Sequence, residues 1–83
     1  MVQHKLKTWQ PWFKDTLEGR KRFEYRKNDR DFQEGDDLFL EEYDPRVKSY
    51  TGGVFVVSVE YIVENCPGLP KGYCIMGIFS LLW

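Results

Sequence analysis

The stretch from Phe55 to Val63 alternates between two side-chain faces, and this feature constrains the fold of the chain most strongly. A repeat of two residues is typical of a β-strand whose two faces differ in burial. One face carries Ser58 and Glu60, whereas the other is apolar or aromatic throughout and comprises Phe55, Val57, Val59, Tyr61 and Val63. The chain therefore contains at least one long strand that packs one face against a core.

Turn signals divide the rest of the chain into further elements. Alternation or apolar runs predict strands at residues 2–8, 22–27, 38–43 and 73–82. Pro11 and Gly19 are typical of the first turn and the end of a helix. The order of one strand, one helix and four strands predicts an α+β, mainly β fold, a small and mainly antiparallel barrel or curved sheet with one helix between strands 1 and 2.

The alternation and the helical spacing also predict which side chains are buried. Trp9, Phe13 and Leu17 recur every four residues, so we expect them to form one apolar stripe that packs on the core. In the strand at residues 22–27, Phe23 and Tyr25 are expected on the core face, and Arg22, Glu24 and Arg26 on the polar face.

The length of the chain and its cysteines limit the possible classes of protein. Eighty-three residues suffice for one modest core, so residues 1–83 are expected to form a single domain. Cys66 and Cys74 have no metal-binding spacing, and we expect no metal and no cofactor. The apolar run at residues 73–83 is shorter than the roughly 20 residues that span a membrane. Without an apolar N-terminal segment, a cytoplasmic protein with reduced thiols is expected.

Charge is distributed unevenly along a chain whose formal net charge is −1. Residues 1–30 carry nine Lys or Arg against four Asp or Glu, whereas the remainder carries three against nine. A locally basic face attracts a polyanion whatever the net charge, because local potential steers charged partners. A solvated surface of paired charges, such as Arg22, Glu24 and Arg26 opposite acids of the sheet, remains the alternative.

The basic residues are clustered with groups that can bind a nucleotide. Guanidinium groups offer forked donors to phosphate or to a base edge, and an amide both donates and accepts. Nearby aromatic side chains, including Tyr25 and Tyr50, are candidates for base stacking. The single histidine, His4, lies on the apolar face of its strand, where a structural role is favoured over catalysis. The clustered polar residues are Lys21, Glu24, Arg26, Asn28 and Arg30.

Several motifs resemble the small bacterial and phage branch of the ASCH superfamily, the activating signal cointegrator homology domains. The central one is the segment Lys21-x-Phe23-Glu24-x-Arg26-Lys27-Asn28-Asp29-Arg30-x-Phe32, and further matches are His4-x-Leu6-Lys7, Gly35-Asp36, Glu42-Tyr43-Asp44, Tyr50-Thr51-Gly52 and Gly72-Tyr73. The resemblance covers nearly the whole chain. It implies a PUA-like β-barrel and a role in RNA binding.

Some ASCH relatives are amidohydrolases that deacetylate 4-acetylcytidine with a lysine, a threonine three residues later and a distant glutamate. Lys21 matches that lysine, but Glu24 stands where the threonine would be. The residues after Tyr73 contain no acid to supply the distant glutamate. A binding module is therefore favoured over an enzyme, and an amidohydrolase or nucleoside-modifying enzyme that uses Lys21 and Glu24 remains the alternative.

The sequence thus predicts an RNA- or nucleotide-binding module with its ligand in a cleft between the helix and the barrel. Lys21, Arg26 and Arg30 are expected to contact phosphate or a base edge. Glu24 and Asn28 are expected to recognise a base, and Tyr50 and Thr51 to close the site, with His4 as a further candidate. A protein-interaction domain is the third hypothesis, and a homodimer through the C-terminal strand is a possible assembly.

Overall fold

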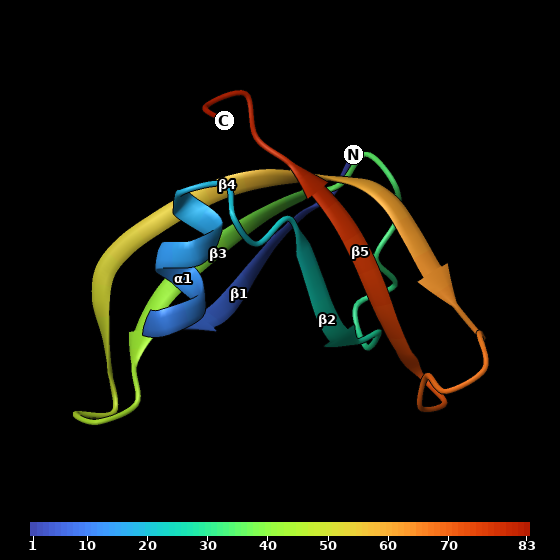
Figure 1. Cartoon of the computed structure of the whole chain (residues 1–83), viewed down its shortest axis with the longest axis horizontal. Coiled ribbons are helices and arrows are strands. Elements are labelled where there is room, and N and C mark those ends of the chain that lie inside the picture. The colour runs from blue at the N-terminus through green and yellow to red at the C-terminus, as the bar shows by residue number, and fades with distance from the viewer.

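The computed structural model describes residues 1–83, and its elements follow the predicted order of one strand, one helix and four strands (Figure 1). The helix lies between the first two strands and strands predominate, which confirms the predicted α+β, mainly β class. The elements are β1 (Gln3–Trp9), α1 (Gln10–Leu17), β2 (Phe23–Lys27), β3 (Asp37–Asp44), β4 (Ser49–Glu64) and β5 (Tyr73–Phe79).

All five strands belong to one sheet, in the order β1-β3-β4-β5-β2. β1 and β3 are parallel, whereas the other three neighbouring pairs are antiparallel. The sheet curls into a half-barrel, and Figure 1 shows it as an arch with α1 beneath one arm. The curl is what matters for function, because it brings together the two edge strands, β1 and β2, which do not pair with each other in the sheet.

The core is a cluster of eleven buried apolar side chains to which every element except β2 contributes. In β1 the buried residues are His4, Leu6 and Thr8, which confirms the predicted alternation of that strand. The alternation in β5 buries Cys74, Met76 and Ile78. β5 ends at Phe79, so its predicted extension to residue 82 was wrong.

The alternation predicted for residues 55–63 holds as far as Val59. The register between β4 and β5 shifts between Val59 and Tyr61, opposite Ile78 and Gly77, so Glu60 is an extra, unpaired residue. A bulge of this kind moves the following side chains to the other face. Tyr61 is therefore 63% exposed, and its predicted place on the buried face was wrong.

The apolar stripe predicted for the helix is only partly present. Phe13 is buried, but Leu17 is exposed, and Trp9 lies at the end of β1 with its side chain also exposed. The reason is that α1 has only eight residues and buries just Phe13 and Thr16. The end of the helix is as predicted, because Gly19 adopts a φ of 77° there.

The faces of β2 are the reverse of those predicted. Glu24 is 2% exposed, whereas Phe23 and Tyr25 are each about half exposed. The rule that aromatic side chains face inward fails because β2 lies at the sheet edge and adds nothing to the apolar core. Its inward position is occupied instead by a carboxylate with two cationic partners.

Candidate functional site

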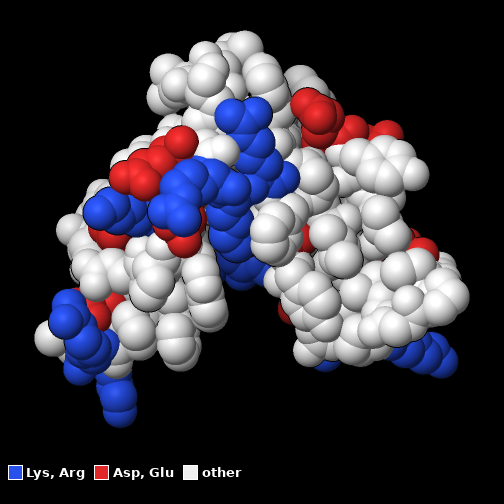
Figure 2. Space-filling view, in the orientation of Figure 1, with Lys and Arg blue, Asp and Glu red and all other residues white.

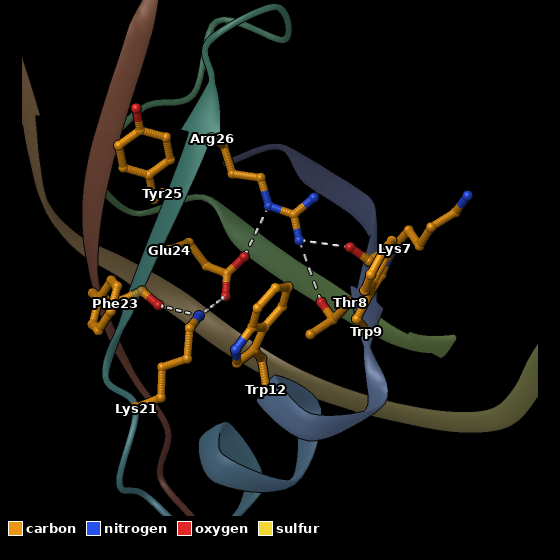
Figure 3. A pocket seen from close by; sticks show the side chains of 9 residues that line it. All are labelled: Lys7, Thr8, Trp9, Trp12, Lys21, Phe23, Glu24, Tyr25 and Arg26. Carbon is orange, nitrogen blue, oxygen red and sulfur yellow. Dashed lines mark hydrogen bonds and ion pairs between the residues drawn. The ribbon is translucent and has the colours of Figure 1, made fainter. Parts of the chain in front are cut away.

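A pocket of about 480 Å³ lies where the edge strands β1 and β2 approach each other (Figure 3). Its volume is within the range of small-molecule and cofactor sites. The pocket is lined by residues of β1, α1, β2 and the segment before β2: Lys7, Thr8, Trp9, Trp12, Lys21, Phe23, Glu24, Tyr25 and Arg26. The site therefore brings together residues that are distant in sequence.

Glu24 is the buried charge at the base of this pocket. Its Oε2 accepts a hydrogen bond of 2.7 Å from Lys21 Nζ, and its Oε1 accepts one of 2.9 Å from Arg26 Nε (Figure 3). A buried carboxylate requires such partners, because removing an unpaired charge from water is costly. Glu24 in turn fixes the position of both cations.

Arginine side chains connect the two edge strands. Arg26 Nη2 donates to the Lys7 carbonyl oxygen at 2.7 Å and to Thr8 Oγ1 at 3.3 Å. Arg30 Nη1, from the segment after β2, donates to the Lys5 carbonyl oxygen at 2.8 Å. These bonds give carbonyl groups of an edge strand, β1, additional partners, and they hold the pocket walls together.

Both cations that contact Glu24 keep donors for a ligand. Lys21 Nζ donates to the Phe23 carbonyl oxygen and to Glu24, which occupies two of its three hydrogens. Arg26 Nη1 has no hydrogen-bond partner within the chain. The side chains of Lys21 and Arg26 are 19% and 25% exposed, whereas that of Glu24 is 3% exposed. A ligand therefore meets the cations before it meets the carboxylate.

Two tryptophans provide a flat aromatic surface at the other side of the pocket. Trp9 and Trp12 stack with ring centroids 5.9 Å apart and an interplanar angle of 17°. In Figure 3 the Trp12 indole stands between Trp9 and the Lys21–Glu24 pair. Because Trp12 is 53% exposed, its ring is available for stacking with a planar ligand.

The pocket carries more positive than negative charge. Lys7, Lys21 and Arg26 are balanced within it only by Glu24. Figure 2 shows Lys and Arg side chains gathered in the hollow between the two arms of the arch. Charge of one sign in a hollow raises the local concentration of ligands of the opposite sign. The site therefore favours an anionic ligand.

Four of the other residues predicted for the site lie outside the pocket lining. Asn28 donates to Glu64 Oε1 and accepts a 2.9 Å bond from the Phe32 amide, so it orders the segment after β2. Thr51 donates to Glu42 Oε1 at 2.6 Å, and Tyr50 packs edge-to-face on Tyr43. The fourth, Arg30, bonds to the Lys5 carbonyl oxygen as described above.

His4 belongs to a separate buried pair. Its Nε2 lies 2.9 Å from Asp36 Oδ2, and its ring packs edge-to-face on Phe32. Burial raises the pKa of Asp36, but hydrogen bonds from His4 and from two backbone amides outweigh burial and hold that pKa below its ordinary value. The pair therefore anchors the start of β1 to the segment before β3 and does not line the pocket.

Sequence reasoning missed the contribution of β1 and α1 to the site. Lys7, Thr8, Trp9 and Trp12 line the pocket, but Trp9 was interpreted as a packing residue of a helix and Trp12 was not predicted for the site. Two tryptophans separated by two residues beside a basic strand are the signal that points to a surface function.

The structure holds no group of three or more His, Cys, Asp or Glu arranged to bind a metal ion. It has no helix with the length and apolarity needed to cross a membrane. Burial raises the pKa of the Cys74 thiol, and the nearby Glu64 carboxylate raises it further. Cys74 is thus suited to core packing and not to nucleophilic chemistry.

A family model described as a domain of unknown function (DUF3850) matches residues 3–78. The match includes the helix, four of the strands in full, β5 up to Ile78, and every residue that lines the pocket. No curated protein matches the chain.

Proposed function

We propose that this chain, which belongs to the DUF3850 family of domains of unknown function, binds a nucleotide of RNA and holds its base or modified nucleoside in the pocket between β1 and β2. One observation carries the proposal: the exposed indole of Trp12 lines the same pocket as two cations whose positions a buried carboxylate fixes. An aromatic face stacks on any base, and lysine and arginine bind phosphate or the oxygens of a base edge.

The residues would divide the work of recognition. The free donors of Lys21 and Arg26 would bind oxygen atoms of the ligand, while Trp12 stacks on the base. Glu24 would act through the two cations, because its own side chain is nearly inaccessible. This assignment changes the role expected for Glu24 from direct recognition of a base to positioning of Lys21 and Arg26.

The proposal includes a relationship to ASCH domains, which the motif at residues 21–32 suggests. This relationship adds the expectation of an RNA ligand.

The proposal also includes a cytoplasmic location. The free thiols of Cys66 and Cys74 are typical of a protein in a reducing compartment.

Fluorescence anisotropy with a labelled single-stranded RNA tests the proposal. Three cations in contact with a single strand predict that affinity falls about 20-fold between about 50 mM and about 200 mM salt. Trp12→Ala should weaken binding about 5-fold or more, because stacking on the indole is lost. Tyr50→Ala is the matched control, since Tyr50 is equally exposed but lies outside the pocket. Absence of binding at low salt, or equal effects of the two variants, would overturn the proposal.

A small amidohydrolase is the second candidate, favoured by the 2.7 Å contact between Lys21 and Glu24 in the pocket. The contact of Glu24 with Arg26 and its burial count against it, because a catalytic carboxylate must reach the substrate. Turnover of acylated nucleosides that disappears in Lys21→Ala would support hydrolysis. No turnover across a panel of such nucleosides would exclude them as substrates.

A further inference from the structure

The outer face of the arm formed by β4, β5 and β2 is aromatic and has no partner. Cross-strand register places Phe23, Gly77 and Tyr61 in one row and Tyr25, Ile75 and Val63 in the next. We call this the outer aromatic face and define it by the five aromatic residues Phe23, Tyr25, Tyr61, Tyr73 and Phe79. Four of them are between 41% and 63% exposed, and Tyr73 is half-buried against Tyr25, with ring centroids 5.5 Å apart.

Charge on the side of this face that adjoins the pocket favours an anionic partner. The side chains that alternate outward from β2 and β5 include Lys27 and no acid. The acids lie at the far side, where Glu60 is exposed in the bulge of β4 and Asp37 accepts a hydrogen bond from Ser58, the register partner of Phe79. In Figure 2 the arm that carries β5 is largely free of charged side chains; both acidic and basic side chains lie at its margins, and Lys and Arg fill the adjoining hollow. A face of separately exposed aromatic rings beside cations is typical of single-stranded nucleic acid binding.

The outer aromatic face is continuous with the pocket. Phe23 and Tyr25 belong to the face, and both also line the pocket. Lys21 contacts both sites, because its Nζ lies 2.7 Å from Glu24 Oε2 in the pocket and 4.8 Å from the centroid of the Phe23 ring. A chain that leaves the pocket across β2 therefore reaches this face without crossing an acidic surface.

Gly77 shapes the centre of the face. It lies between Phe23 and Tyr61 in the register of three neighbouring strands and contributes no side chain there. Strand spacing separates the two aromatic residues by roughly 10 Å. The rings thus stand apart as two stacking positions and do not merge into one packed cluster.

We infer that the ligand is a single strand of RNA of several nucleotides, with one base in the pocket and its neighbours stacked on the outer aromatic face. This inference rests on the proposed function of the pocket and extends it. Exposed sheet aromatics stack two or three bases in other RNA-binding folds, and only unpaired bases offer their faces for this contact. A single strand is therefore preferred over both a free nucleotide and a duplex.

The test compares ligands of two lengths on the same variants. The probes are the four nucleoside 5′-monophosphates and a labelled RNA of mixed sequence with about eight nucleotides. The longer RNA should bind wild type more tightly than any monophosphate. Tyr61→Ala and, independently, Phe79→Ala should weaken binding of the RNA about 5-fold or more and leave monophosphate binding unchanged. Val47→Ala on the hairpin between β3 and β4 is the exposed control.

The outcomes separate this inference from the proposed function. If Trp12→Ala weakens binding of both ligands but Tyr61→Ala and Phe79→Ala weaken neither, the pocket proposal stands and the outer-face inference is wrong. If no probe binds wild type, both are wrong. If sedimentation shows a wild-type dimer that Tyr61→Ala converts to a monomer, the face is an interface between two copies and the inference is overturned.

Discussion

Glu24 is the residue on which the geometry of the pocket depends. It accepts hydrogen bonds from Lys21 and Arg26 while almost fully buried. Glu24→Ala should lower the free energy of unfolding by about 1–3 kcal/mol, because donors of both cations lose their acceptor. Urea denaturation measures this loss. Glu18→Ala, which removes an exposed carboxylate at the end of α1, should change stability by less than about 0.5 kcal/mol. Equal stability of the two variants would contradict the role assigned to Glu24.

Asp36 gives the protein an acid-sensitive anchor. Its pKa is lower in the folded chain, so near that pKa the unfolded chain binds more protons and stability rises with pH. The contribution is complete above the ordinary aspartate pKa of about 4 and is lost as pH falls through the lowered folded value. Asp36→Asn should therefore be less stable at neutral pH and should lose less stability on acidification.

Urea midpoints at pH 7, pH 4 and pH 3 check this prediction. Asp29→Asn, in the exposed segment after β2, is the control and should keep the pH profile of wild type. A profile of Asp36→Asn that is parallel to that of wild type would show that the His4–Asp36 pair does not carry the acid sensitivity.

At the scale of elements, local patterns predicted the strands but not all of their neighbours. The turn residues and alternation predicted the order of all six elements, and His4 and Leu6 share a buried face as expected. The parallel pairing of β1 with β3 was not predictable, because a helix and another strand separate them in the chain. The two-residue period indicates that a strand has two different faces, but the elements that pack against the strand decide which face is buried.

β2 illustrates that limit, and it explains why the site was only partly predicted. Its two-residue period was correct, but Glu24 faces inward since Lys21 and Arg26 neutralise it. The spacing of residues in the sequence does not show that the side chains of Lys21 and Arg26 both donate to the Glu24 carboxylate. Trp12 was missed for a similar reason. Helical spacing does not reveal that α1 buries only Phe13 and Thr16 and leaves Trp12 exposed.

The contact between the segment after β2 and β1 provides a prediction at the same scale. Arg30 donates to the Lys5 carbonyl oxygen on the free edge of β1. Arg30→Ala should lower the free energy of unfolding by about 1 kcal/mol and speed amide hydrogen exchange in β1. Arg20→Ala removes an exposed arginine whose carboxylate partner is 3.6 Å away and should have neither effect. Unchanged exchange in β1 after Arg30→Ala would show that the bond does not hold this edge.

At the scale of the whole molecule, a net charge of −1 conceals a basic hollow. Lys and Arg gather between the arms of the arch in Figure 2. Lys7 of β1 is one of the cations that line the pocket. If RNA binds there, Lys7→Gln should reduce the slope of log affinity against log salt by about 0.7, the value for one contact with a single strand. Lys48→Gln, at the tip of the hairpin between β3 and β4, should leave the slope unchanged. Equal slopes for both variants would place the bound phosphates elsewhere.

The central claim is that the pocket between β1 and β2 holds a base, and ¹H–¹⁵N NMR titration with single-stranded RNA tests it most directly. Three indole signals report on Trp9, Trp12 and Trp83, of which only the first two line the pocket. The claim predicts that the Trp12 indole and the amides of Lys21, Glu24 and Arg26 shift with ligand. The Trp83 indole, which packs partly buried against the core with its Nε1 atom inaccessible, should stay in place. Shifts confined to the hairpin between β3 and β4, or a stationary Trp12 signal at saturating RNA, would contradict it.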